Sequence, residues 1–197
     1  MMKLLIATTN SGKKREFISL LQDLPLELVF PTNLGIHIEV DETGSTYEEN
    51  AALKAVTLSK VSGLLALADD TGLEVDALDG RPGLFSARFS PIIGATDADR
   101  RSKLLHELHG KPKPWDARFC CAVALANPDG CVAIYDGEVS GEIITQERGE
   151  HGFGYDRLFW IPQIDKTMAE LTIEEKNKYS HRAIAVKKAI QQLIKKL

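Results

Sequence analysis

The sequence contains few cysteines, and their spacing is not that of a metal site. Cys120 and Cys121 are neighbours in an apolar, strand-like run, and Cys131 follows a predicted turn. The absence of any CxxC or Cys/His ligand spacing argues against a zinc module. We expect three reduced, buried thiols with a structural role.

Long apolar runs are also missing. No run approaches the ~18 residues that a membrane-spanning helix needs, and the N-terminal segment turns polar after a short apolar stretch. We therefore expect an unprocessed cytoplasmic chain without a membrane partner.

A strong excess of one charge is absent, because the formal net charge is only −4. This balance argues against a general electrostatic attraction to nucleic acid. Positive residues do gather locally, at residues 13–15 and between Lys176 and Arg182. Each such cluster fits either the binding of one small anion or a solvated helix face.

The sequence has no internal repeat, low-complexity tract or linker, and its 197 residues predict a single domain over residues 1–197. Helical patterns alternate with buried runs, and residues 127–130 predict a hairpin turn. We therefore predict an α/β fold with a mixed central β-sheet flanked by helices. The predicted strands are 3–7, 26–30, 64–68, 73–78, 117–126 and 131–143, and the predicted helices are 13–24, 47–61, 96–110, one opened by Thr172, and one from about residue 180.

The polar loop "ATTNSGKKR" at residues 7–15 joins a predicted strand to a predicted helix. It departs from the P-loop pattern at Ala7 and at Lys14. Backbone N–H groups at a helix start, together with the charge of Lys13, still suit a phosphate. The alternative is an ordinary capped helix.

Two adjacent acids, Asp69 and Asp70, follow the apolar run "LLALA". Carboxylates placed side by side repel each other, and Mg²⁺ removes this difficulty by binding one or two carboxylates together with phosphate oxygens. The alternative is a surface turn, because Asp-Asp-Thr-Gly is also good turn chemistry. Another acidic ligand could come from Glu39, Asp41 or Glu42, and spacing alone does not decide which.

Two further loops carry groups suited to a nucleotide. Phe153 and Tyr155 stand among glycines and offer flat faces for stacking on a base, or alternatively form an aromatic corner of the core. Lys176, His181 and Arg182 lie near predicted helix ends, where cations suit anionic or oxo groups. Together, the four loops match a nucleoside triphosphate with Mg²⁺.

Five segments resemble those of the inosine triphosphatase-like, or Ham1-like, family of non-canonical purine nucleoside triphosphate pyrophosphatases. The resemblance extends in the family's order from residue 7 to residue 182. It implies two lobes with an active-site cleft, a cytoplasmic homodimer, and Mg²⁺-dependent hydrolysis of ITP, dITP and XTP to the monophosphate and pyrophosphate. The segments are "ATTNSGKKREF", "ETGSTYEENAALKA", "ADDTGLEVDALDGRPGLFSARFS", "GFGYDRLF" and "ELTIEEKNKYSHR".

The resemblance also implies roles for individual residues. Asp70 is the expected general base, and Glu42, Asp69 and Asp70 are the expected metal ligands. The expected substrate contacts are Thr8, Thr9, Asn10, Ser11, Gly12, Lys13 and Lys54 toward the phosphates, and Phe153, Gly154, Tyr155, Asp156, Lys176, His181 and Arg182 toward the base and ribose. Thr71 is a further expected contact with the substrate.

The chain departs from the family pattern at two places. Residues 91–95 read "PIIGA" where a more acidic segment is expected, and Arg157 stands where the family often has proline. Both departures bear on substrate preference. Two other functions fit the same residues: a Maf-like pyrophosphatase of pyrimidine or modified nucleotides, and a nucleotide-binding regulator without turnover.

Overall fold

The computed structural model describes residues 2–130 and 132–194. The chain forms two compact units, each assembled from separate stretches. Unit 1 comprises Met1–Asp70, Cys121–Gly137 and His181–Leu197, and unit 2 comprises Thr71–Cys120 and Glu138–Ser180. Among the described residues, no helix has the length and apolar character needed to cross a membrane. The single domain over 1–197 stays a prediction.

The strands form one mixed sheet in the order β2-β1-β3-β5-β6-β7-β8, with β4 paired to β3. Strand β1 runs parallel to β2 and β3, whereas the β3–β4, β6–β7 and β7–β8 pairs are antiparallel. The predicted mixed α/β fold is thereby confirmed. The strands are β1 (Met2–Ile6), β2 (Leu26–Val29), β3 (Leu65–Val75), β4 (Pro82–Gly83), β5 (Asp116–Ala126), β6 (Val132–Ile143), β7 (Phe159–Ile161) and β8 (Lys166–Thr167).

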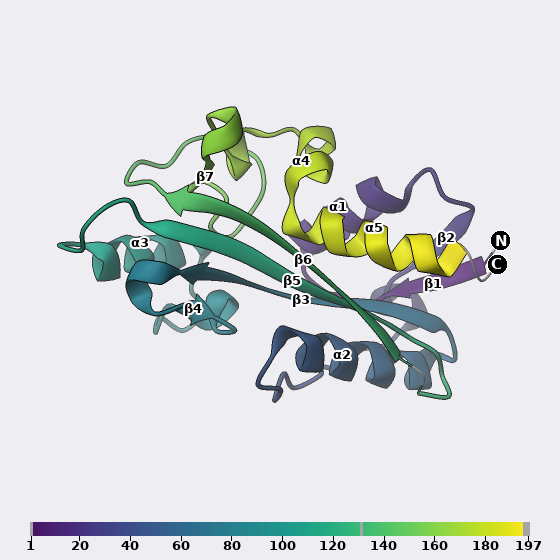
Figure 1. Cartoon of the computed structure of the whole chain (residues 1–197). Helices are drawn as coiled ribbons and strands as arrows, with labels where there is room; N and C mark the ends of the chain where they lie inside the picture. Colours follow the sequence, from purple (N-terminus) through teal and green to yellow (C-terminus); the bar gives the residue numbers. More distant parts are fainter. Residues whose placement is uncertain (1, 131, 195–197) are drawn as a thin grey trace. The chain divides into compact units, whose positions relative to one another are not determined.

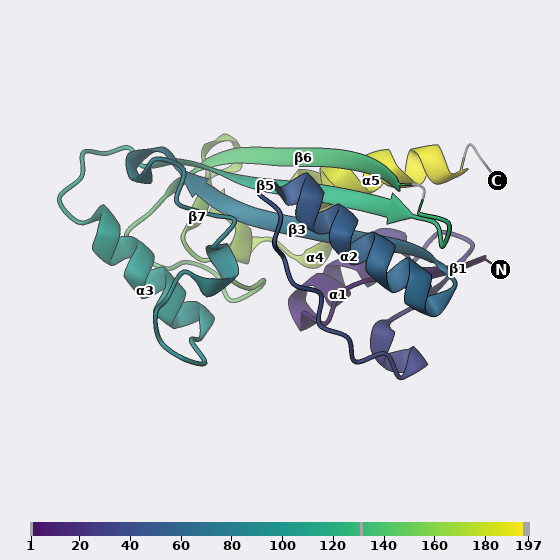
Figure 2. The same cartoon turned by 90° about the horizontal axis from the view of Figure 1, so that it is seen from below.

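In unit 1, helices cover both faces of the sheet (Figure 1). Helices α1 (Ser11–Leu21) and α5 (His181–Ile194) pack on one face, and α2 (Tyr47–Ser62) packs on the other. Side chains alternate along β3 accordingly, because successive residues of a strand point to opposite faces. Leu67 joins the core under α1 and α5, whereas Ala66 and Ala68 join the core under α2, the helix that lies in front of the strands in Figure 2.

The helices of unit 1 begin at residues that satisfy their first backbone N–H groups. The side chain of Asn10 accepts a hydrogen bond from the Lys13 N–H at the start of α1. Thr46 caps α2 in the same way through the N–H of Glu49, as the sequence predicts. These caps fix the first turn of α1 shortly after β1, and the first turn of α2 beside Asp70 in the middle of β3.

Unit 2 contains helices α3 (Asp97–Leu108) and α4 (Ile173–Tyr179) and a separate apolar core. Leu104 and Leu108 of α3 belong to this core, which also includes Phe119 and Phe159. The Phe119 and Phe159 rings lie 4.5 Å apart between centroids. Short 3₁₀ helices cover Pro31–Leu34, Asp76–Leu78, Ser86–Arg88, Pro162–Ile164 and Met168–Glu170.

Two expectations from the sequence need correction. The predicted turn at Asp69 and Asp70 is wrong, because β3 continues unbroken through both acids to Val75. Cys121 is buried as expected, but Cys120 is only half-buried. The expectation for Cys131 lies outside the described residues.

Candidate active site

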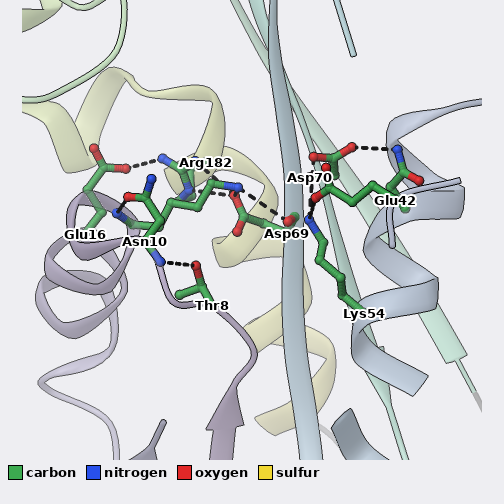
Figure 3. Close-up of polar contacts among 10 residues, drawn as sticks. Thr8, Asn10, Glu16, Glu42, Lys54, Asp69, Asp70 and Arg182 are labelled. Atoms are coloured by element: carbon green, nitrogen blue, oxygen red, sulfur yellow. Dashed lines mark hydrogen bonds and ion pairs between the residues drawn. The ribbon is translucent and has the colours of Figure 1, made fainter. Parts of the chain in front are cut away.

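Asp69 and Asp70 point to opposite faces of β3 (Figure 3). The alternation of a strand places neighbouring side chains on opposite faces, so two adjacent acids continue the strand without facing each other. Both side chains are buried. Each carboxylate is matched by cations on its own face, and this pairing is what allows an apolar run to end in two acids.

On the face of α1 and α5, Asp69 is held by two cations. Its Oδ2 accepts hydrogen bonds from Arg182 Nε at 3.0 Å and Nη2 at 2.9 Å. Lys13 Nζ lies 3.0 Å from the same oxygen, and Arg182 Nη1 also donates to Glu16. Burial alone would lower the pKa of Arg182, but the carboxylates of Asp69 and Glu16 raise it by more. The pKa of Arg182 therefore lies above its ordinary value.

On the face of α2, Asp70 lies among an amide, a cation and a second acid. Asn50 Nδ2 donates to Asp70 Oδ2 at 3.1 Å, and Lys54 Nζ lies 3.6 Å from Asp70 Oδ1. Lys54 Nζ also donates to Glu42 Oε1 at 2.5 Å. The backbone N–H of Gly44 donates to Asn50 Oδ1 at 2.8 Å, which fixes the amide orientation that Asp70 needs.

Burial raises the pKa of Asp70 above its ordinary value, and the nearby charge of Glu42 raises it further. Lys54, Lys13 and the hydrogen bond from Asn50 oppose this shift without cancelling it. A carboxylate whose pKa is moved toward neutrality is a better proton acceptor, as a general base requires. For Lys54, burial lowers the pKa, but the surrounding carboxylates of Asp69, Asp70 and Glu42 raise it by more.

The loop between β1 and α1 presents its polar groups as predicted. Thr8 Oγ1 accepts from the Asn10 N–H at 3.2 Å, and Thr9, Asn10 and Ser11 are exposed. Gly12 is buried in the first turn of α1, where the helix N-terminus favours anions. The chain therefore combines a capped helix with groups suited to phosphate, so the two interpretations of this loop do not exclude each other.

The expected metal ligands do not lie together. Among residues 2–130 and 132–194, no three carboxylate, imidazole or thiol groups converge on one point. Glu42 and Asp70 share a partner in Lys54 Nζ, so their oxygens face a common space, whereas Asp69 is on the opposite face of β3. Two carboxylates still suit Mg²⁺, which completes its coordination with phosphate oxygens and water.

Unit 2 contains five of the residues predicted to contact the base and ribose, namely Phe153, Gly154, Tyr155, Asp156 and Lys176, whereas His181 and Arg182 belong to unit 1. Lys176 Nζ donates to Asp156 Oδ2 at 2.5 Å and lies 5.2 Å from the centre of the Phe153 ring. The same Asp156 oxygen accepts from the Phe153 N–H at 2.9 Å. Tyr155 is buried in the core of unit 2 and donates to the carbonyl of Ser86 at 2.9 Å, so the core interpretation holds for this ring. Phe153 is half-buried.

The cationic residues near the last two helices are buried, so a solvated helix face is wrong for them. Lys176 lies within α4, and His181 and Arg182 open α5, as the sequence predicts. All three are less than 5% exposed. Thr71, the next residue of β3 after Asp70, is half-buried and belongs to unit 2.

Two supporting residues are missed by the sequence analysis, although a signal for each exists. Asn50 precedes Lys54 by one helical turn, and both contact Asp70 from the same face of α2. Glu16 follows Lys13 by three residues on α1, and its carboxylate and the Lys13 ammonium meet the Arg182–Asp69 pair. Helical spacing from a predicted site residue therefore identifies both.

Comparisons with known proteins agree with this geometry. The model of the Ham1 family matches residues 4–192. A dITP/XTP pyrophosphatase of Desulfotalea psychrophila is 45% identical to this chain, and the match covers 98% of this chain and 86% of that protein. A dITP/XTP pyrophosphatase of Synechocystis sp. is 48% identical, and the match covers 96% of this chain and 94% of that protein. The structure of a HAM1 protein from Coxiella burnetii superimposes with a TM-score of 0.88 at 39% identity, covering 99% of this chain and 100% of that chain.

Proposed function

Because this chain belongs to the Ham1 family, we propose that it hydrolyses non-canonical purine nucleoside triphosphates, with dITP, ITP and XTP as substrates. The products are the nucleoside monophosphate and pyrophosphate. The observation that carries the proposal is the buried carboxylate of Asp70, held among Asn50, Lys54 and Glu42. A site that only bound nucleotides would not need a carboxylate with a raised pKa beside two further charges.

In the proposed reaction, water attacks the α-phosphorus and the α–β anhydride bond breaks. The carboxylate of Asp70 takes the proton of the attacking water, and Asn50 holds that carboxylate in position. Lys13 and Lys54 neutralise the negative charge that develops on the departing pyrophosphate. The loop residues Thr8, Thr9, Asn10, Ser11 and Gly12 bind phosphate oxygens through hydroxyl, amide and backbone N–H groups.

We propose that Mg²⁺ is the cofactor and that Glu42 and Asp70 hold it. When bound, the ion would neutralise the part of the negative phosphate charge that Lys13 and Lys54 do not compensate. Support comes from the donor set, because two carboxylates that already share a cationic partner form a hard oxygen site. Asp69 is expected from the family resemblance to join them. Its contacts with Arg182 and Lys13 instead favour a role in holding these two cations.

We propose that Phe153, Gly154, Tyr155 and Asp156 form the purine pocket, in which the buried Tyr155 anchors the loop through its hydrogen bond to Ser86. Lys176, His181 and Arg182 complete the recognition of the purine, and Thr71 touches the substrate. The Phe153 ring supplies a face for stacking, worth about 1–3 kcal/mol per base. Hypoxanthine and xanthine carry a 6-oxo acceptor where adenine carries a 6-amino donor. A site that presents hydrogen-bond donors at this position disfavours adenine, because donor would then face donor.

The test is a substrate panel with separate detection of pyrophosphate and orthophosphate. Purified protein with Mg²⁺ is incubated with dITP, XTP, GTP, ATP or dTTP, and the Asp70→Asn variant serves as the control. Pyrophosphate from dITP and XTP, strongly reduced in the variant, supports the proposal. Orthophosphate, or hydrolysis of dTTP in preference to the purines, contradicts it and favours a different nucleotide substrate.

We further propose that the protein acts on free nucleotides in the cytoplasm as a homodimer. The net charge of −4 favours a small substrate over nucleic acid. The dimer rests on the family resemblance. Light scattering after size-exclusion chromatography measures the mass directly, and a mass near 21.7 kDa would show a monomer instead.

A further inference from the structure

We propose that helix α3 positions the base-binding loop, through two side chains that hold the backbone N–H and the backbone carbonyl of Gly154. The N–H of Gly154 donates to Asp97 Oδ2 at 2.7 Å, and its carbonyl accepts from Arg101 Nη1 at 2.8 Å. The two side chains belong to the first turns of α3 and are four residues apart, so they project from the same face. Asp97 and Arg101 are positioning residues, and the inference rests on the proposed function of the loop.

The geometry of Arg101 is fixed by a second contact. Its Nε and Nη2 donate to the two oxygens of Glu147 at 2.7 and 3.1 Å, which leaves Nη1 directed at Gly154. A guanidinium supplies this planar fork of donors, whereas a lysine cannot. Arg157 Nη1 also lies 3.5 Å from Glu147, so the residue that departs from the family pattern supports the same network.

The start of α3 is itself rigidly defined. Thr96 and Asp99 form a reciprocal capping box, in which each side chain accepts from the backbone N–H of the other. Arg100 ties the same turn to the preceding segment through the carbonyls of Ala87 and Ala95. Asp97 therefore presents its carboxylate from a fixed backbone.

The contacts of α3 complete a set that fixes three consecutive residues of the loop. Asp156 is held by Lys176, and Tyr155 by the carbonyl of Ser86. Gly154 has a φ of +61°. Its backbone N–H is held by Asp97, and its carbonyl is held by Arg101. A preorganised loop loses less conformational entropy when the substrate binds. Removing these contacts is therefore expected to weaken substrate binding more than it slows the chemical step.

The experiment compares four variants with the wild-type protein on dITP and dATP. Arg101→Met and Asp97→Ala each remove one hydrogen bond to Gly154 and are expected to raise KM for dITP about tenfold, with kcat nearly unchanged. Asp97→Asn keeps an oxygen acceptor for the Gly154 N–H and is expected to restore most of the affinity. Since both side chains hold the backbone of one residue, the double variant Asp97→Ala/Arg101→Met is expected to raise KM by less than the product of the single effects.

Arg118→Met is the matched control. Arg118 also pairs with a glutamate of the same unit, because its Nε and Nη2 each lie 2.8 Å from Glu74 Oε2, and Glu74 lies outside the loop. Hydrogen exchange of a peptide spanning residues 150–158 supplies a measurement that does not depend on turnover. Protection is expected to fall in Arg101→Met and to be retained in Arg118→Met.

The outcomes separate the two proposals. If wild-type protein does not hydrolyse dITP, the proposed function fails, and hydrogen exchange alone then decides whether α3 orders the loop. If dITP is hydrolysed but Arg101→Met leaves both KM and exchange unchanged, the role of α3 is overturned. A fall in kcat with unchanged KM also overturns it, because that result places Arg101 in the chemical step.

Discussion

At the scale of single residues, the strand β3 assigns different environments to two neighbouring acids. Asp69 is enclosed by cations on one face, whereas burial and a second acid disfavour the charge of Asp70 on the other. The first arrangement stabilises an ionised carboxylate for structure, and the second adjusts a carboxylate for chemistry. Identical side chains therefore lead to opposite expectations on substitution.

Asp70→Asn is expected to lower kcat for dITP by about 100-fold or more, because an amide cannot accept the proton of the attacking water. Binding of the nucleotide is expected to be largely retained. Steady-state kinetics with pyrophosphate detection, together with direct binding measurements, check both parts. Near-normal turnover would remove Asp70 from the role of general base.

Asp69→Asn is expected to act mainly on stability. Removing one member of a buried, hydrogen-bonded ion pair costs about 3–5 kcal/mol, because Arg182 then keeps its charge with less compensation. Urea unfolding measures this loss, with Asp70→Asn as the control that should change the unfolding midpoint little. Equal destabilisation by the two variants would contradict the division of roles between the acids.

At the scale of elements, side chains from helices fix the loop that is proposed to bind the base. The segment 152–156 folds around Asp156, whose Oδ2 receives hydrogen bonds from Lys176 and from the Phe153 N–H. Gly152 makes this fold possible. A Cβ on Gly152 would lie 2.0 Å from Asp156 Oδ2, and its φ is +74°.

Gly152→Ala is therefore expected to displace Asp156 and to raise KM for dITP at least tenfold. Gly80→Ala is the matched control, since its φ of +82° imposes the same backbone strain of about 1–2 kcal/mol while an added Cβ meets no atom within 4 Å. Kinetics and melting temperatures of both variants distinguish strain from collision. Similar KM values in the two variants would show that the close contact with Asp156 is unimportant for binding.

The start of α3 gives a pH-dependent contribution to stability. Burial tends to raise the pKa of Asp97, but hydrogen bonds from Arg100 and the Gly154 N–H, with the charges of Arg100 and Arg101, lower it overall. A carboxyl with a lowered pKa stabilises the fold above its ordinary pKa and loses that contribution as pH falls through the folded value. The melting temperature of wild-type protein is expected to exceed that of Asp97→Asn at pH 7, and the difference should vanish below about pH 3. If the difference in melting temperature persists in acid, it arises from a change in packing or hydrogen bonding and not from the charge of Asp97.

Much of this arrangement could be predicted from the sequence, for identifiable reasons. Apolar periodicity, the caps at Thr46 and Thr172 and the hairpin turn identify the helices and most strands. The turn predicted at Asp69 and Asp70 fails because local turn propensity is overridden by cations from distant segments, Arg182 among them. The contacts of Asp97 and Arg101 could not be predicted either, since they join α3 to a loop more than 50 residues away along the chain.

At the scale of the whole molecule, the residues with proposed roles are distributed over both units, with His181 and Arg182 in unit 1 and Lys176 in unit 2. Unit 1 contains the phosphate loop and both carboxylates proposed for Mg²⁺, and unit 2 contains the loop proposed for the base. Three strands, β3, β5 and β6, contribute residues to both units.

Ligand binding is consequently expected to stabilise the protein in a metal-dependent way. An α,β-methylene analogue of dITP, which resists hydrolysis, should at 100 times its Kd add about 2.7 kcal/mol, or roughly 5–10 °C in melting temperature. Thermal unfolding with Mg²⁺ and with EDTA checks this, and Glu42→Gln should reduce the Mg²⁺-dependent part. An equal shift in EDTA would show that binding does not require the metal.

The unbroken strand β3 also limits how this chain can change over evolutionary time. Side chains in a strand alternate strictly, so inserting or deleting one residue between Leu65 and Asp69 would exchange the faces of the two acids. A deletion would place Asp70 where Asp69 now meets Arg182 and Lys13, and an insertion would place Asp69 where Asp70 now meets Lys54. In each case the other acid would move away from its present partners. Point substitutions in β3 can be tested and selected one at a time, but a change of length by a single codon would remove both arrangements together.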